Sequence, residues 1–347
     1  MTEFEKIWDF HNLYKAHTVA RRGKRTNRET IEFEMNLSEN LIYLSQSIRN
    51  KTYRIKGYYH FLVYEPKERK IHALHYADRV VQHCLCDEVL APLLDRHLIY
   101  DNAACRIGRG THFSLNRLKL FLQKFYKKYG NEGYFLKCDI RKYFDSIDHA
   151  ILKAKLKKLI KDEDVKWLLW QIIDSYEAKP GKGLPLGNQT SQWFALYYLD
   201  SLDRLVKEKL KIKYYTRYMD DCVLIFQERK YLKECLMKMR EVVEKNLLLE
   251  FNQKTQIFPI RNGVDYLGFH FYMTKSGKII KKVRTQTKKK YRKKLKLLKY
   301  RYAMGECDLS EVQQIISSYE AHLSHGSTYC LRKKVMGEFV LQRNSGD

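Results

Sequence analysis

The chain of 347 residues carries 66 Lys and Arg against 40 Asp and Glu, a formal net charge of +26, and 44% of its residues are hydrophobic. This much apolar material supports one or two buried cores, which excludes a wholly disordered chain. No stretch reaches the 18 or more apolar residues of a membrane span and the start lacks a signal-peptide pattern, so we expect a cytoplasmic protein with no membrane partner.

The excess of positive charge predicts a polyanionic partner, because Lys and Arg side chains placed against phosphates release condensed counterions. Nucleic acid is the leading interpretation, and an anionic membrane surface is the alternative. The eight cysteines are scattered and form no C-x-x-C pair. Their spacing favours reduced, mostly buried thiols over a zinc site or disulfides.

The first third of the chain predicts helices around one basic hairpin. Residues 1–56 are polar and basic with a single helical apolar pattern, typical of an N-terminal arm and a helix. Two strands at 61–64 and 71–74 flank a charged turn. Asp78 is the expected N-cap of the next helix, and another helix is expected at 112–129.

The middle of the chain alternates strand and helix patterns, which favours an α+β fold with an antiparallel sheet. After about residue 280 the composition becomes strongly basic, with 12 Lys and Arg in residues 281–301, and two further helical patterns follow. The expected elements are strands at 134–139, 213–217, 222–226, 256–260 and 264–272, helices at 148–160, 164–177, 190–209 and 229–246, and a glycine-rich turn at 181–188.

Three carboxylates are the candidate catalytic residues. Asp220 and Asp221 lie in the turn between two apolar strands, and Asp139 ends another apolar strand. Carboxylates this close repel one another unless a cation lies between them. If the strands are neighbours, the three side chains suit two Mg²⁺ ions about 4 Å apart, with Mn²⁺ as a substitute, arranged for in-line phosphoryl transfer.

Five motifs occur in the order found in reverse transcriptases, and together they resemble the bacterial, group II intron-like members of that family. The resemblance implies a right-hand polymerase fold with fingers, palm and helical thumb, in which the palm holds an antiparallel sheet and the YxDD hairpin. The motifs are 63–67, 78–82, the first palm motif at 139–149, the YxDD box Tyr218-Met219-Asp220-Asp221 and the primer grip at 265–269. The implied domains are an N-terminal arm and helix at 1–56, fingers at 57–133, palm at 134–275 with a finger segment around 150–180, and a basic thumb at 276–347.

The same resemblance implies roles for individual residues. Asp139, Asp220 and Asp221 would ligate the metals together with the Ile140 carbonyl. Phe144 would exclude a ribose 2′-hydroxyl, for which core packing is the alternative role. The other nucleotide-binding residues would be Lys67 and Arg69 on the hairpin tip, Lys254 near the leaving pyrophosphate, and Leu186 and Gln192. Nucleic-acid contacts would come from Arg106, Arg109, Tyr218, Tyr266, Gly268, Lys289 and Lys293.

The segment 183–192 narrows the resemblance to one subfamily. Leu186 and Gln192 stand where most reverse transcriptases carry glutamine and proline, and the segment is similar to that of diversity-generating retroelements, whose enzymes make errors at template adenines. That implies a template RNA, a primer or cDNA strand, dNTPs and a small basic accessory variability protein. A retron-like or phage-defence reverse transcriptase is the first alternative, and a non-catalytic, maturase-like RNA-binding protein is the second.

Overall fold

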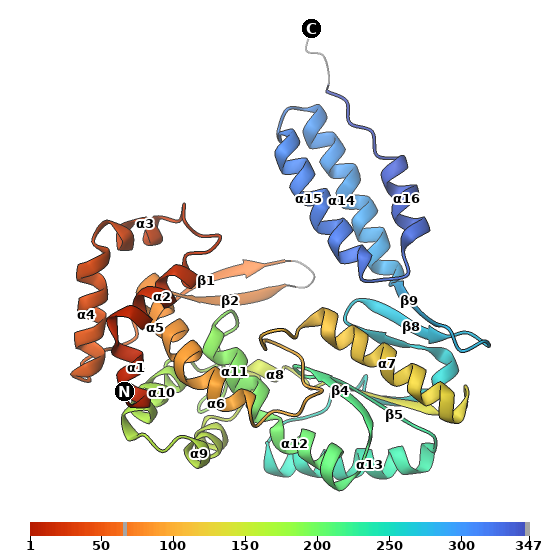
Figure 1. Ribbon diagram of the computed structural model, residues 1–347, viewed down its shortest axis with the longest axis horizontal. Coiled ribbons are helices and arrows are strands. Elements are labelled where there is room, and N and C mark those ends of the chain that lie inside the picture. The colour runs from red at the N-terminus through yellow and green to blue at the C-terminus, as the bar shows by residue number, and fades with distance from the viewer. Residues whose placement is uncertain (65–67, 344–347) are drawn as a thin grey trace. The chain divides into compact units, whose positions relative to one another are not determined.

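The structure is a computed structural model that describes residues 1–64 and 68–343 (Figure 1). The chain forms two compact units, each assembled from separate stretches of sequence. Unit 1 contains Met1–Gly110, Cys138–Cys222 and Lys233–Thr255. Unit 2 contains Thr111–Lys137, Val223–Leu232 and the chain from Gln256 onward.

The N-terminal segment of unit 1 contains four helices, so the prediction of an arm with one helix at 1–56 is wrong. Thr2 and Glu5 form a capping box at the first helix, and Asp9 caps the second. The error has a physical cause: Ile7 and Leu13 are completely buried although polar residues surround them in the sequence. The four helices are α1 (Glu3–Trp8), α2 (Phe10–Ala20), α3 (Arg28–Met35) and α4 (Leu37–Arg49).

The predicted basic hairpin is confirmed as strands β1 (Tyr58–Val63) and β2 (Arg69–Leu74), which pair antiparallel. Helix α5 (Tyr76–Leu85) follows and continues through a π-helical turn into α6 (Ala91–Asp95). Asp78 does not cap α5. Its buried carboxylate instead accepts hydrogen bonds from the Tyr53 hydroxyl at 2.6 Å and from the Lys56 backbone N–H at 2.9 Å, which tie the preceding loop to the helix.

The helices in the middle of the chain differ from the prediction at two places, because the short helix α8 was not expected and a longer helix is interrupted. The single helix expected at 190–209 is broken at Leu199 into two helices and a π-helical turn. Asp148 and Asp162 cap α9 and α10 by accepting backbone N–H bonds. The elements are α8 (Tyr143–Ser146), α9 (His149–Leu159), α10 (Glu163–Asp174), α11 (Gln189–Tyr198), α12 (Asp200–Arg204) and α13 (Arg229–Glu241).

Two further sheets are antiparallel wherever a register is defined. The first holds β3 (Tyr134–Cys138), β4 (Tyr214–Tyr218), β5 (Asp221–Phe226) and β6 (Gln256–Pro259) in the order β4-β5-β3-β6, with β3 antiparallel to β6. The second holds β7 (Val264–Tyr266), β8 (Phe269–Met273) and β9 (Ile279–Val283). The strand predicted at 264–272 is therefore a hairpin, because Leu267 and Gly268 adopt positive φ angles of 46° and 86° and turn the chain.

Unit 2 carries the basic C-terminal helices α14 (Thr285–Ala303), α15 (Leu309–Ser324) and α16 (Tyr329–Gly337), which follow β9 in Figure 1. Leu298, Cys307 and Val312 form the core between α14 and α15. The expected thumb at 276–347 therefore begins with a strand, and its first helix starts at Thr285. Helix α7 (Thr111–Tyr129), expected within the fingers at 57–133, clusters with unit 2 instead.

Helices mixed with antiparallel sheets confirm the predicted α+β class. All eight cysteines are free, and six of them are buried, as expected for reduced thiols. In the part of the chain that the structure describes, no helix has the length and apolar character needed to cross a membrane.

Candidate active site

The structure brings the predicted carboxylates together within unit 1. Asp139 directly follows β3, while Asp220 lies in the tight connection between β4 and β5, and Asp221 is the first residue of β5. Burial, followed by the negative charges of Asp139 and Asp221, raises the pKa of Asp220 to about 6, and Asp139 and Asp220 also share a side-chain hydrogen bond. The three side chains therefore form a single electrostatically coupled site.

A buried arginine, Arg217, stabilises the turn that carries Asp220. Met219 takes a left-handed φ of 54°, and its carbonyl accepts a hydrogen bond of 2.7 Å from Nη1 of Arg217. Arg217 is completely buried, and its Nη2 donates to the Leu196 carbonyl at 3.0 Å. Arg217 was not predicted as a site residue. A cation among the tyrosines of a buried strand does, however, indicate a buried ion pair.

The charge of Arg217 is balanced by Asp203 of α12, whose side chain is also completely buried. Nη2 of Arg217 lies 2.6 Å from Oδ2 of Asp203, and the Tyr215 hydroxyl donates to Oδ1 of Asp203 at 2.6 Å. Burial alone would lower the pKa of Arg217, but the charge and hydrogen bonds of Asp203 raise the pKa above its ordinary value. The guanidinium therefore stays charged and links the turn to α11 and α12.

Asp139 is fixed by a short antiparallel ladder with residues 250–252. The Asn252 N–H donates to the Asp139 carbonyl at 2.7 Å, and Nδ2 of Asn252 donates to Oδ2 of Asp139 at 3.1 Å. Ile140 bridges Phe251, and the Arg141 N–H donates to the Glu250 carbonyl at 2.8 Å. The Ile140 carbonyl makes none of these hydrogen bonds, so the ladder is compatible with the metal-ligand role predicted for this carbonyl. Asn252 was not predicted as a site residue.

The donor set fits a hard divalent cation. In residues 1–64 and 68–343, no group of three or more His, Cys, Asp or Glu side chains has the geometry of a metal site as the side chains stand. Asp139 and Asp220 nevertheless present carboxylate oxygens to each other with a raised pKa at Asp220, and a divalent cation between them would remove that repulsion. Asp139 and Asp220, with Asp221 beside them, are therefore the residues that would hold Mg²⁺.

Phe144, Leu186 and Gln192, which were predicted to bind the nucleotide, belong to unit 1 like the carboxylates. The Phe144 carbonyl accepts a hydrogen bond from the Leu184 N–H at 2.8 Å, and the Leu186 carbonyl accepts one from the His72 N–H of β2 at 3.4 Å. The glycine-rich segment is thus joined both to α8 and to the hairpin. Gln192 lines a cavity of about 380 Å³ together with Phe61 and Ile71 of the hairpin.

The predicted cations of this site differ in what the structure shows of them. Arg69 is exposed at the start of β2, whereas Lys67 lies outside the described residues. Lys254 is exposed, and its backbone N–H donates to Oδ1 of Asn252 at 3.1 Å. Lys254 therefore lies two residues after Asn252, which contacts Asp139.

Arg106, for which a nucleic-acid contact was predicted, is held within its own loop. Its guanidinium is buried, forms an ion pair with Asp95 and donates to the carbonyls of Ile99 and Asn102 at 2.8 and 2.9 Å. Arg106 therefore stabilises its own loop. Arg109 is half-buried over the ring of Tyr100, with 4.6 Å from the guanidinium carbon to the ring centroid.

The other predicted nucleic-acid residues divide between the units. Tyr218 ends β4 in unit 1 and is half-buried. In unit 2 the Tyr266 side chain is buried, and its hydroxyl lies 2.6 Å from Oγ of Ser114. Gly268, next to it, is half-buried in the hairpin turn. Lys289 and Lys293 are exposed one turn apart on α14, as expected for a phosphate-binding face.

Comparisons with known proteins identify relatives of this chain. Protein YkfC of Escherichia coli K12 is 24% identical, over 57% of this chain and 62% of its own length. The group II intron-encoded protein LtrA of Lactococcus lactis is 26% identical, over 44% of this chain and 26% of its own length. The putative COX1/OXI3 intron 2 protein of Saccharomyces cerevisiae is 30% identical, over 36% of this chain and 15% of its own length. The chain thus spans less than two thirds of these relatives.

The fold also matches a solved structure. The telomerase of Candida albicans, in complex with the TWJ fragment of telomeric RNA, aligns with a TM-score of 0.50 at 12% identity, over 84% of this chain and 61% of its own. This likeness confirms the predicted polymerase-type fold. A family model described as reverse transcriptase (RNA-dependent DNA polymerase) matches residues 57–271, which include all three carboxylates. Because that segment is more than half of the chain, the chain belongs to the reverse transcriptase family.

Proposed function

We propose that the protein is an RNA-directed DNA polymerase that copies a template RNA into cDNA from dNTPs. The observation that carries the proposal is the convergence of Asp139, Asp220 and Asp221, where burial and then the neighbouring negative charges raise the pKa of Asp220 to about 6. A protein that only binds RNA gains nothing from a half-buried cluster of like charges, because such a cluster costs stability. Two-metal phosphoryl transfer, in contrast, requires such a cluster of carboxylates to hold the metal ions.

In the proposed reaction the primer 3′-hydroxyl attacks the α-phosphorus of a dNTP. The new P–O bond extends the primer, the hydroxyl proton is released to solvent, the bond from the α-phosphorus to the bridging oxygen of the β-phosphate breaks, and pyrophosphate leaves with the electron pair. Asp139, Asp220 and Asp221 would hold Mg²⁺, or Mn²⁺ in its place, and the bound ions would supply activation of the hydroxyl and neutralisation of the leaving oxygen. Asn252 and Arg217 orient the carboxylates through the contacts described above, since each fixes the backbone beside one of them.

Around the reacting atoms, other residues select and hold the nucleotide. Phe144 excludes a ribose 2′-hydroxyl by its bulk, and Arg69 and Lys67 neutralise the triphosphate. Lys289 and Lys293 hold phosphates of the template–primer duplex through exposed positive charge. The partners are thus template RNA, a primer or cDNA strand, and dNTPs.

The deciding experiment replaces Asp139 or Asp220 by Asn, which keeps the shape of the side chain and removes its charge. Primer extension on an RNA template should fall at least about 10³-fold, since losing a metal ligand removes several kcal/mol of transition-state stabilisation. Asp164→Asn is the matched control, because that carboxylate is partly exposed and forms an ion pair with Lys51. Normal extension by either site variant would contradict the proposal and favour a non-catalytic RNA-binding protein.

We further infer that the enzyme belongs to a diversity-generating retroelement, makes frequent errors at template adenines and works with a small basic accessory protein. Leu186 and Gln192 support this subtype, because an apolar side chain at position 186 removes a polar restraint on the geometry of the templating base. Leu186 adjoins β2, and Gln192 lines the cavity next to it. A retron-like or phage-defence enzyme remains the alternative, and it would copy all four bases with similar accuracy.

A further inference from the structure

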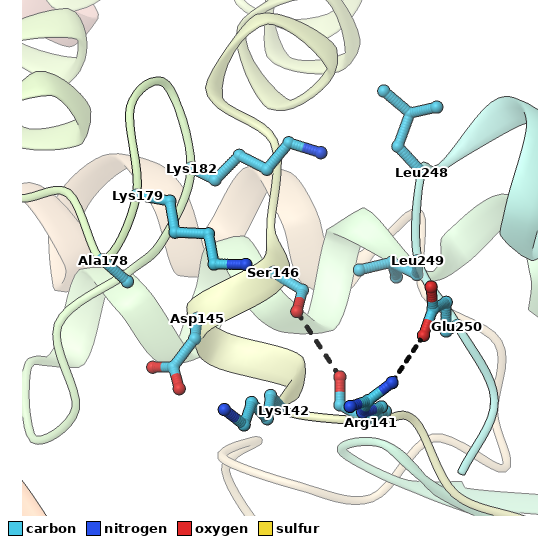
Figure 2. Close-up of a pocket in the computed structure, with 10 residues that line it drawn as sticks. All are labelled: Arg141, Lys142, Asp145, Ser146, Ala178, Lys179, Lys182, Leu248, Leu249 and Glu250. Carbon is cyan, nitrogen blue, oxygen red and sulfur yellow. Dashed lines mark hydrogen bonds and ion pairs between the residues drawn. The ribbon is translucent and has the colours of Figure 1, made fainter. Parts of the chain in front are cut away.

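A second, strongly positive pocket of about 390 Å³ lies in unit 1 (Figure 2). Figure 2 shows Lys179 and Lys182 extending from one loop toward the side formed by residues 248–250. The charged residues that line the pocket are the cations Arg141, Lys142, Lys179 and Lys182 and the carboxylates Asp145 and Glu250.

The positive charge of this pocket is only partly neutralised by the protein. Nη1 of Arg141 pairs with Oε2 of Glu250 at 3.1 Å. The Lys182 ammonium lies 3.8 Å from Asp148, at the outer limit of an ion pair. The side chains of Lys142 and Lys179 have no hydrogen-bond or ion-pair partner within residues 1–64 and 68–343. A concave site with unneutralised ammonium groups is suited to a small anion that carries several charges.

The position of the pocket indicates which anion this is. Along the ladder described above, Asp139 pairs with Asn252 and Arg141 pairs with Glu250. Side chains two residues apart on a strand share one face and lie about 7 Å apart. Arg141, which lines the pocket, is therefore the next residue on the same face as Asp139, the carboxylate proposed to hold Mg²⁺. We infer that the phosphates that leave the reaction can reach the pocket from there.

We propose that this pocket binds pyrophosphate, the leaving group of the proposed polymerase reaction on which this inference rests. Pyrophosphate carries several negative charges on a short, rigid frame, so two ammonium groups and a guanidinium can contact it together. The same chemistry is presented by the β- and γ-phosphates of an incoming dNTP. The phosphates of a dNTP would occupy the pocket before the new P–O bond forms, and pyrophosphate would occupy it afterwards.

The loop that carries the two lysines is held by its backbone, so these side chains can be removed without disturbing it. The Ala178 N–H donates to the Lys182 carbonyl at 2.9 Å, and the Gly183 N–H donates to the Ile147 carbonyl at 2.8 Å. Gly183 has a φ of 114°, and a Cβ at this position would lie 2.7 Å from the Ala178 nitrogen. Neither contact involves the side chain of Lys179 or Lys182.

The test compares the Lys179→Ala/Lys182→Ala variant with the unmodified protein. Binding of inorganic pyrophosphate is measured by calorimetry without nucleic acid, and inhibition of primer extension by added pyrophosphate is measured separately. Lys157→Ala/Lys158→Ala is the matched control, because it removes the same charge from the exposed face of α9. We expect the pocket variant to bind pyrophosphate at least about 10-fold more weakly, as for the loss of a charge-assisted hydrogen bond, and the control to be unchanged.

Further measurements separate the sources of the anion. A KM for dNTP that stays constant while pyrophosphate binding weakens assigns the pocket to the product. A KM that rises in parallel assigns it to the dNTP tail and overturns the assignment to the product. If the pocket variant binds pyrophosphate as tightly as the unmodified protein, or if it loses affinity for RNA and not for pyrophosphate, the proposal that the pocket binds pyrophosphate is refuted. Calorimetry requires no polymerisation, so an unmodified protein that binds pyrophosphate but extends no primer would count against the proposed function alone.

Discussion

The buried pair of Arg217 and Asp203 should be the largest single electrostatic contribution to the stability of unit 1. Arg217→Met removes the guanidinium and leaves the Asp203 carboxylate in a fully buried position. Breaking a buried pair in this way costs about 3–5 kcal/mol, and the carbonyls of Met219 and Leu196 lose a donor as well, at about 1–3 kcal/mol for each one left unsatisfied. We therefore expect a loss of at least about 4 kcal/mol from a total of about 5–15 kcal/mol.

Tryptophan fluorescence during urea unfolding measures this loss directly. All four tryptophans, Trp8, Trp167, Trp170 and Trp193, lie in unit 1, so the signal reports on the unit that contains the pair. Arg28→Met is the matched control, because Arg28 of unit 1 forms an exposed pair with Glu32, and screening by solvent leaves such a pair little effect on stability.

The double variant Arg217→Met/Asp203→Leu separates the charge from the hydrogen bonds. It should be less destabilised than the sum of its two single variants, because neither charge is then left unpaired. Primer extension should nevertheless stay slow, since the Met219 carbonyl has lost its donor. A free energy of unfolding for Arg217→Met within about 1 kcal/mol of the unmodified protein would refute this reasoning.

Three further predictions concern how the enzyme selects and holds its substrates. Phe144→Ala should raise ribonucleotide relative to deoxynucleotide incorporation in a competition assay, and unchanged selectivity would assign the ring to core packing. Lys289→Ala/Lys293→Ala should reduce the slope of log K for RNA binding against log salt by about 0.7–0.9 per lost contact, whereas an unchanged slope would place these lysines away from phosphate. Leu186→Gln should reduce errors opposite template adenine, by up to about 10- to 200-fold if the lost contact is fully restored, and cDNA sequencing with equally low error at all four bases before the change would remove the mutagenic role.

The central elements were predictable because their signals are local. The strands that flank Asp220 and Asp221 are short, nearly continuous runs of apolar and aromatic residues, typical of buried strands, and the carboxylates lie at the turn between them. The strand before Asp139 is equally plain. Such patterns depend on neighbouring residues alone, so the order and type of these elements follow from the sequence.

The contacts that could not be predicted belong to residues whose surroundings come from distant segments of the chain. Tyr266 is buried against Ser114, which is 152 residues away, so nothing near it in the sequence indicates burial. Asn252 and Arg217 act on the carboxylates through backbone and side-chain contacts that only the folded chain creates. Arg106 reads as a free cation because its sequence neighbours do not show that Asp95 lies beside it.

The contact of Asn252 with Asp139 has a consequence for the order in which the site is made. The two residues are 113 positions apart, so the ladder closes one of the longer loops in unit 1 and should form late in folding. At about 5–20 residues per second, the ribosome adds Asn252 some 6–23 s after Asp139. A nascent chain that stops before Asn252 would therefore contain all three carboxylates and still lack the contact that holds the first of them in place.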